Sequence, residues 1–358
     1  MKENTFKYVQ FTFQIGLHKD DVYVLEYIMN TFKCGHISRS NNKVNYFVND
    51  LNSLFYIIIP IFNYFNLNSS KYHHFNLFAK AVKLKKENKN LSDVNKLQVI
   101  KLKKEMQNMS SLARKWIPNS INDKIRINKF WLAGFIDGEG TFSTNKCIPR
   151  FKLENHIKEL ELYNKIRDFI GTDRFLYVSN RTDQNPTIIL EINKIKELKE
   201  NLIPLMYHDN SIILKTLKSK DFLLWLKLID MYYKGYHTTF EGKFVFDAIK
   251  LHINKYRLTT NNALLINRER ISIDKIEALI SELYLTESPY ELRQNVRYYR
   301  NTNKLVSEAI KIVAMKDNYK KIYDSITECA KDINISRKCI KKSIDSGKSY
   351  KGYVFVLN

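Results

Sequence analysis

One stretch decides the fold: Phe130-Trp131-Leu132-Ala133-Gly134-Phe135-Ile136-Asp137-Gly138-Glu139-Gly140-Thr141-Phe142-Ser143. At 100° per residue, its side chains divide between two faces of a helix. The bulky face can pack on a domain core, and it carries Leu132, Phe135 and Ile136. The opposite face has small side chains and carries Ala133, Gly134, Asp137 and Gly138.

The small face predicts that a second helix packs closely against this one, because small side chains let two helix backbones approach each other. A glycine inside a helix costs about 1 kcal/mol relative to alanine, so two glycines indicate a purpose. Glu139 follows in the last turn, and Gly140 could end the helix in the left-handed conformation. We therefore expect a paired helix that presents a carboxylate at its tip. The plainer interpretation is an amphipathic core helix with two chance glycines.

Nine consecutive residues, Leu132 to Gly140, resemble the signature motif of the LAGLIDADG homing endonucleases and their RNA-maturase relatives. The resemblance implies an α+β fold built from a duplicated αββαββα repeat, in which two motif helices lie side by side. It also implies that the small face forms the helix–helix interface, with Ala133, Gly134, Asp137 and Gly138 as its residues.

Cutting a phosphodiester bond needs a positioned hydroxide and charge stabilisation at the attacking and leaving oxygens, which divalent metals supply. Mg²⁺ (or Mn²⁺) takes oxygen ligands. By the resemblance, Glu139 is a catalytic residue and a metal ligand, and the backbone carbonyl of Gly138 also faces the metal. Family members also place a basic residue near the scissile phosphates. Here the best candidate is Lys218, with Lys220 as runner-up, and Lys71 holds the matching place in the first repeat. Each of these lysines could instead be a solvated surface residue.

The charge of the chain indicates a polyanionic partner. Among 358 residues, Lys and Arg number 59 and Asp and Glu 37, which gives a net charge of +22. Double-stranded DNA is the leading partner, group I intron RNA is a second one, and an anionic membrane surface is the weaker alternative. No apolar run approaches the 18 residues that would cross a bilayer, so no membrane partner is expected.

Cysteine usage and residue bias indicate the compartment. The four cysteines are scattered without the spacing of a zinc site, which favours a reducing compartment. No signal or transit peptide is recognisable at the start of the sequence. Frequent Asn, Lys, Ile and Tyr are typical of an AT-rich genome, and with the resemblance they predict an organelle-encoded protein of the mitochondrion.

An internal repeat surrounds the motif. Residues 8–17 alternate as a strand, with a helix and a hairpin after them, and residues 150–154 begin the same succession again. Residues 84–128 are polar and lysine-rich and connect the copies. The predicted domains are a first LAGLIDADG-like repeat, a second repeat with the intact motif and a helical extension, and a linker with a DNA-binding module, at residues 1–120, 121–300 and 301–358.

The first repeat lacks a motif helix of its own. Nothing between Met1 and Tyr8 can form a second glycine-faced helix with a terminal acid. Reading frames of this family are often fused to the upstream exon, so an upstream exon-encoded segment is expected to supply the missing helix. The chain as it stands is then expected to be impaired in double-strand cleavage.

Outward-facing side chains of the predicted strands form the expected DNA surface, because a β-surface in the major groove can reach base edges. Ordinary polar outer faces of half-buried strands are the alternative. The candidates in the two repeats are Gln10, Thr12, Gln14, Arg150, Lys152, Glu154, Arg174, Tyr177 and Arg181.

The last 50 residues have the pattern of a small helical module. A capping box at Ser325–Glu328 opens one short helix, and Ser336 caps the next after a turn. This spacing is typical of a helix-turn-helix, whose second helix enters the major groove. The segment also resembles the modular DNA-binding domain often appended to homing endonucleases. Its basic residues are Arg337, Lys338, Lys341 and Lys342; a basic tail packed on the body is the alternative.

Three functions remain open from the sequence. The first hypothesis is a site-specific DNA endonuclease, encoded in a group I intron, that hydrolyses phosphodiester bonds in double-stranded DNA with a divalent metal. The second is an RNA maturase that assists group I intron splicing without cleavage, which the missing acid favours. The third is a repressor-like DNA-binding protein built on the C-terminal module, which the motif disfavours.

Overall fold

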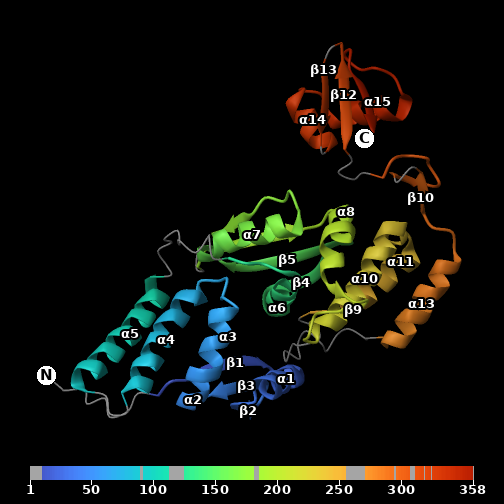
Figure 1. Cartoon of the computed structure of the whole chain (residues 1–358). Coiled ribbons are helices and arrows are strands. Elements are labelled where there is room, and N and C mark those ends of the chain that lie inside the picture. Colours follow the sequence, from blue (N-terminus) through green and yellow to red (C-terminus); the bar gives the residue numbers. More distant parts are fainter. Residues whose placement is uncertain are drawn as a thin grey trace. The chain divides into compact units, whose positions relative to one another are not determined.

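The computed structural model of the chain describes residues 10–88, 92–112, 125–180, 185–254, 271–293, 296–306, 311–317, 319–323 and 325–357. It is an α+β structure of helices and small antiparallel sheets, as the sequence predicts (Figure 1). Its described residues divide into two compact units. One contains the residues up to 141, 151–192 and 199–221; the other contains 142–150, 193–198 and those from 222 onward.

The first repeat begins, within the described residues, with a strand. Its elements are β1 (Phe13–His18), α1 (Val22–Phe32), β2 (His36–Ser40), β3 (Lys43–Val48), α2 (Leu51–Ser53), α3 (Ile59–Tyr64), α4 (Lys71–Glu87) and α5 (Asp93–Leu112). The strands form an antiparallel sheet in the order β1-β3-β2. Alternate residues of β3, including Val44 and Tyr46, are fully buried against Leu25 of α1 and Val82 of α4.

The second repeat begins with the motif helix. Its elements are α6 (Lys129–Glu139), β4 (Gly140–Asn145), β5 (Ile148–His156), α7 (Leu160–Ile170), β6 (Tyr177–Ser179), β7 (Thr187–Ile192), α8 (Ile195–Glu197), α9 (Ile203–Leu205), β8 (Tyr207–His208), β9 (Ser211–Ile212) and α10 (Lys218–Lys234). The four longer strands form a sheet in the order β4-β5-β7-β6. On β5, Phe151 and Leu153 are fully buried, as their alternation predicts.

Strand β1 of the first repeat corresponds to β5 of the second. Each ends in a histidine, His18 or His156, whose Nδ1 accepts a hydrogen bond from the backbone amide two residues later. One 3-10 turn and a helix follow in both repeats. Within the described residues, the first repeat therefore starts at a point where the second has already formed α6 and β4. Among the described residues, the first repeat has no counterpart of α6 or β4.

The extension after the second repeat is helical only at first. Helices α11 (Phe240–Lys250) and α13 (Ile273–Leu285) fit the predicted pattern, but β10 (Tyr290–Arg293) and β11 (Val296–Tyr299) form an antiparallel hairpin. Arg297 explains the difference, because it is buried among tyrosine rings and donates hydrogen bonds to the carbonyls of Tyr232 and Tyr233. In the hairpin the ring centroids of Tyr290 and Tyr299 lie 5.0 Å apart, whereas a helix would place these two residues on opposite faces.

The C-terminal module contains a sheet as well as the two predicted helices. Strands β12 (Ile312–Lys316), β13 (Tyr319–Tyr323) and β14 (Val354–Leu357) lie in the order β13-β12-β14 and pack on α14 (Ile326–Asp332) and α15 (Arg337–Ser346). The hydroxyls of Ser325 and Ser336 cap the two helices as predicted. The expectation of a small helical module is incomplete, because Ile312 and Ala314 of β12, Tyr323 of β13 and Phe355 of β14 complete its core.

Candidate active site and DNA-binding surfaces

The motif helix α6 forms as predicted and starts at an asparagine cap. The side chain of Asn128 accepts a hydrogen bond from the amide of Trp131 at 2.9 Å. Leu132 and Ile136 are fully buried, whereas Gly134 and Gly138 are exposed. A Cβ atom placed on either glycine would meet no atom within 4 Å. This glycine face is therefore open among the described residues. Ala133, which was assigned to the same face, is buried instead.

Gly140 ends α6 for a different reason from the one predicted. Its φ of −76° and ψ of 149° are extended, not left-handed. A Cβ on this residue would lie 2.7 Å from Cγ2 and 2.8 Å from the carbonyl oxygen of Ile136. The glycine is required because the chain turns from helix into β4 against Ile136, which leaves no room for a side chain.

Asp137 holds the chain segment that leads into α10. Its Oδ2 accepts a hydrogen bond from the amide of Lys215 at 2.7 Å. Its Oδ1 accepts from the amide of Thr216 at 3.2 Å and from the Thr216 hydroxyl at 2.6 Å. Both carboxylate oxygens of Asp137 therefore bind the segment just before α10.

Lys218, the preferred lysine candidate, lies at the tip of the motif helix. Its ammonium donates to the carbonyl oxygens of Ile136 at 3.0 Å and Gly140 at 2.6 Å. A cation at a helix C-terminus is favoured by the partial negative charge of the last carbonyls. The runner-up, Lys220, is exposed. The structure thus brings Lys218 and the Glu139 end of the helix together.

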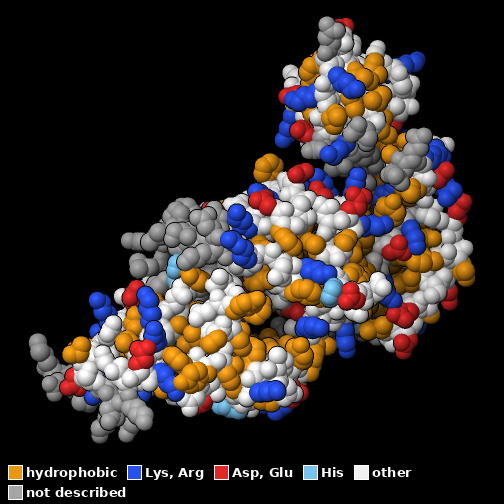
Figure 2. Space-filling view, in the orientation of Figure 1, with side chains coloured by type: hydrophobic (Ala, Val, Ile, Leu, Met, Phe, Trp, Pro, Cys, Tyr) orange, Lys and Arg blue, Asp and Glu red, His pale blue; other side chains and the backbone are white. Residues whose placement is uncertain are grey.

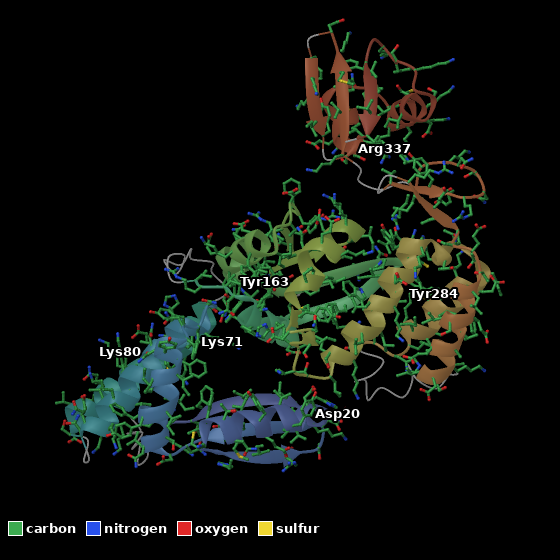
Figure 3. The ribbon with its side chains drawn as sticks, turned by 45° about the vertical axis from the view of Figure 1, so that its right-hand side comes forward. Asp20, Lys71, Lys80, Tyr163, Tyr284 and Arg337 are labelled. Carbon is green, nitrogen blue, oxygen red and sulfur yellow. The ribbon has the colours of Figure 1, made fainter. Side chains whose placement is uncertain are left out.

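Glu139 is exposed at the last residue of α6, and no hydrogen-bond or ion-pair partner for its carboxylate occurs in the part of the chain that the structure describes. Tyr163 of α7 is fully buried and packs edge-to-face on Phe135 (Figure 3). Burial raises the pKa of the Tyr163 hydroxyl, and the negative charge of Glu139 raises it further. Sequence reasoning missed this tyrosine, since only its helical spacing was visible.

The donors at this tip fit a hard divalent cation. They are the Glu139 carboxylate and the carbonyl of Gly138, which is among the last four of the helix and has no intrahelical donor. Mg²⁺ prefers oxygen ligands and keeps several waters, so it can be held by one or two protein groups. No group of three or more His, Cys, Asp or Glu side chains suited to a metal occurs among the described residues. Glu139 and Gly138 are therefore the candidate oxygen donors at this tip.

Lys71 lies at the start of α4 (Figure 3), where Lys218 lies at the start of α10. The turns before the two lysines match, because the hydroxyl of Ser69 accepts from the amide of Lys71 as the hydroxyl of Thr216 accepts from the amide of Lys218. Lys71 is exposed, and within the described ranges its ammonium has no hydrogen-bond or ion-pair partner. The difference between the two lysines is the motif helix beside Lys218.

The predicted DNA-contacting residues of the first repeat are all exposed. Gln14 lies on β1, and its amide donates to Asn45 of β3 at 2.8 Å. Gln10 and Thr12 lie before β1, which begins at Phe13 rather than at residue 8.

In the second repeat, the polar face of β5 is bonded within the sheet. Lys152 and Glu154 form an ion pair, and Glu154 also accepts from the hydroxyl of Thr187 on β7 at 2.8 Å. Arg150 donates to the hydroxyl of Ser143 on β4 at 3.0 Å.

The remaining strand candidates surround β6. Tyr177 is exposed on β6. The strand starts three residues later than predicted, so Arg174 lies in the segment before it, where it is half-buried. Arg181 lies outside the described residues. The face drawn in Figure 2 shows Lys and Arg side chains scattered among hydrophobic and acidic ones.

The second helix of the C-terminal module presents its basic side chains outward. Arg337, at the start of α15 (Figure 3), is exposed together with Lys338 and Lys342, and Lys341 is half-buried. Ile340 on the opposite face is fully buried in the module core. No helix in the described part of the chain is long and apolar enough to cross a membrane.

Known proteins resemble this chain over most of its length. The "Uncharacterized mitochondrial protein RF1" of Saccharomyces cerevisiae is 23% identical across 98% of this chain and 76% of its own length. The "Probable intron-encoded endonuclease 3" of Neurospora crassa is 26% identical across 65% of this chain. The chain spans 46% of the length of that relative.

Solved structures match the fold. The LAGLIDADG homing endonuclease I-GzeII in complex with its DNA target is 27% identical, with a TM-score of 0.56, over 72% of this chain and 92% of that one. The I-SmaMI LAGLIDADG homing endonuclease bound to cleaved DNA has a TM-score of 0.58 at 24% identity, over 69% of this chain and 87% of that one. A sequence model described as LAGLIDADG endonuclease matches residues 1–82 and 132–229, which together are half of the chain. The chain belongs to the LAGLIDADG endonuclease family.

Proposed function

We propose that the protein is an intron-encoded, site-specific endonuclease that hydrolyses phosphodiester bonds in double-stranded DNA with Mg²⁺ (or Mn²⁺). The observation that carries the proposal is the tip of α6, where the exposed Glu139 carboxylate lies at the helix end to which the Lys218 ammonium is bonded. Family membership, relatives named as intron-encoded endonucleases and neighbours solved with DNA support it. One neighbour was solved with its DNA target in the presence of calcium ions.

The residues at the tip take distinct roles in this proposal. Glu139 and the carbonyl of Gly138 would hold the metal, which would supply positive charge for the scissile phosphate and for a bound water. Lys218 is fixed by two carbonyls and contributes positive charge where charge develops on the phosphate oxygens. Asp137 secures the segment before Lys218 and so fixes the approach of α10 to the helix tip.

We further propose that a second motif helix, encoded by an upstream exon segment, completes the site beside Lys71. Such a helix would contact the segment before α4, at Asn68, Ser69 and Lys71. These residues occupy the positions that Lys215, Thr216 and Lys218 hold before and at the start of α10, where they contact α6. Among the described residues, the backbone amides of Asn68 and Ser69 have no hydrogen-bond acceptor. The open glycine face of α6 would pack against the other side of the second motif helix.

DNA binding is proposed for the strand faces and for the C-terminal module. The polar side chains on and beside β1, β5 and β6 would contact the target, and α15 would enter a major groove with its exposed basic residues. With a net charge of +22, binding should weaken steeply with salt. Relatives named as mitochondrial or intron-encoded support the mitochondrion as the location.

One observation favours a maturase role as the second candidate. Only one motif-helix carboxylate occurs in the described residues, and a chain that binds the intron RNA without cutting needs none. The two functions separate in a pair of assays on the purified chain. Nicking of a supercoiled plasmid that carries the intronless insertion site supports the endonuclease, and faster splicing of the intron transcript without nicking supports the maturase. Failure to nick at any Mg²⁺ or Mn²⁺ concentration, despite DNA binding, would overturn the endonuclease proposal.

A further inference from the structure

Two buried carboxylates cap helices across the repeats. Oδ1 of Asp21, in the first repeat, accepts a hydrogen bond from the amide of Leu217 in the second repeat at 2.7 Å. Glu159, in the second repeat, accepts from the amide of Ser70 in the first repeat at 3.0 and 3.2 Å and from the Ser70 hydroxyl. Asp21 is 7% exposed and Glu159 is 5% exposed, so each depends on these bonds for its polar partners.

The two acids occupy equivalent positions. Each closes the 3-10 turn after the matching strands, three residues beyond a histidine whose ring caps that turn, at His18–Asp21 and His156–Glu159. Each amide that they bind belongs to the residue just before a lysine at the start of a 17-residue helix, α4 or α10. The contact is therefore reciprocal, because each repeat provides a carboxylate that binds an amide at the start of the other repeat's long helix.

Neither acid caps its own helix. Asp21 and Glu159 lie at the N-cap positions of α1 and α7, where a carboxylate would normally accept a hydrogen bond from the first turn. The structure gives no side-chain cap bond at either position. Both carboxylates point to the other repeat instead. The first turn of α4 has no cap bond from its own N-cap side chain, because the Ser70 hydroxyl donates to Glu159.

We propose that Asp21 and Glu159 are positioning residues that act across the repeats, with Asp21 fixing Lys218 and Glu159 fixing Lys71. Asp21 binds the amide next to Lys218, whose ammonium must reach the carbonyls of Ile136 and Gly140. Loss of this cap frees the start of α10 and the lysine with it. The catalytic meaning of this arrangement rests on the proposed endonuclease function, but the positioning itself does not.

The experiment compares Asp21→Ala with Glu159→Ala in the full chain. Lysines are labelled with an amine-reactive reagent and quantified by mass spectrometry. In Asp21→Ala, labelling of Lys218 should rise by roughly fivefold, the change expected for loss of one helix cap. In Glu159→Ala, labelling of Lys218 should stay at the wild-type level. An unchanged Lys218 in Asp21→Ala, or an equal rise in both variants, would overturn the proposal.

Conservative variants distinguish positioning from a loss of folding. Asp21→Asn keeps a carbonyl acceptor for the amide of Leu217 and should retain wild-type labelling, and the exposed neighbour Asp20 (Figure 3) gives the control Asp20→Ala. If Asp21→Ala does not fold, Asp21→Ser takes its place, since its side chain is too short to reach Leu217. Wild-type labelling of Lys218 in folded Asp21→Ser would then refute the proposal.

Single-turnover nicking separates this inference from the proposed function. Asp21→Ala should lower the nicking rate by roughly fivefold with unchanged DNA affinity, and Asp21→Asn should restore the rate. Asp168→Ala should leave the nicking rate unchanged, because its exposed carboxylate pairs with Arg167 and contacts neither lysine-bearing helix start. A wild-type chain that never nicks refutes the endonuclease, while the labelling result still decides the positioning role. Normal nicking in Asp21→Ala refutes the positioning role alone.

Discussion

Removal of the Asp137 carboxylate should destabilise the contact between the motif helix and the segment that leads into α10, and so lower the free energy of unfolding. Its two oxygens accept three hydrogen bonds, from the amides of Lys215 and Thr216 and from the Thr216 hydroxyl. A hydrogen bond to a charged group contributes about 1.5–3 kcal/mol. Asp137 is half-buried, so water replaces part of what is lost, and we expect Asp137→Ala to cost roughly 2–4 kcal/mol.

The assay is thermal unfolding of Asp137→Ala beside two controls. A cost of this size should lower the unfolding midpoint by about 3–9 °C. Asp137→Asn keeps an oxygen for the Thr216 donors and loses the acceptor for Lys215, so about half of that shift is expected. Asp168→Ala removes an exposed carboxylate paired with Arg167 and should change the midpoint by about 1 °C or less.

Equal midpoints for Asp137→Ala and Asp168→Ala would refute this reasoning. Such a result would mean that the three bonds do not hold the α10 segment against the motif helix. The role assigned to Asp137 in positioning Lys218 would then have no support.

Two further predictions concern the glycines and a half-buried histidine. Gly140→Ala should destabilise the chain by about 1–3 kcal/mol, because its Cβ would lie 2.7 Å from a carbon of Ile136. Gly134→Ala should stabilise the chain by about 0.5–1 kcal/mol, because its Cβ would meet no atom within 4 Å. Chemical denaturation measures both changes in the free energy of unfolding, and a change of the same sign in both variants would contradict the packing argument. Burial lowers the pKa of His237 to about 4, so the unfolded chain binds a proton that the folded chain does not, and stability is lost as the pH falls from about 6.5 towards 4. His237→Phe should keep the stacking on Tyr232 and show a smaller loss of unfolding midpoint between pH 7 and pH 5; equal losses in both proteins would exclude His237 as the cause.

The motif helix and its surroundings show how far sequence reasoning reaches. Periodicity placed α6 within one residue of its observed start, because burial of Leu132 and Ile136 is a local pattern. The motif resemblance selected Lys218, yet its partners Ile136 and Gly140 lie about 80 residues away and no local pattern names them. Gly140 was assigned to a left-handed turn because local rules consider only φ, whereas crowding by a neighbouring turn decides the residue.

The exchanged caps and the C-terminal sheet were missed for different reasons. The spacing of a histidine and an acid after β1 and after β5 is visible in both repeats, but local rules indicate only that an acid at such a position caps its own helix. Only the tertiary arrangement turns the carboxylates of Asp21 and Glu159 outward to the other repeat. The module strands were missed because charged residues such as Lys320 and Lys321 interrupt the apolar alternation of β13.

We expect this chain to carry one half of a paired active site. The direct measurement is the ratio of linear to nicked plasmid from two proteins, the chain itself and a fusion that places a copy of residues 125–142 ahead of β1. The chain alone should give metal-dependent nicked circles, Glu139→Gln should abolish them while DNA binding persists, and the fusion should add linear DNA. Linear DNA from the unfused chain, or nicking that survives Glu139→Gln, would contradict the central claim.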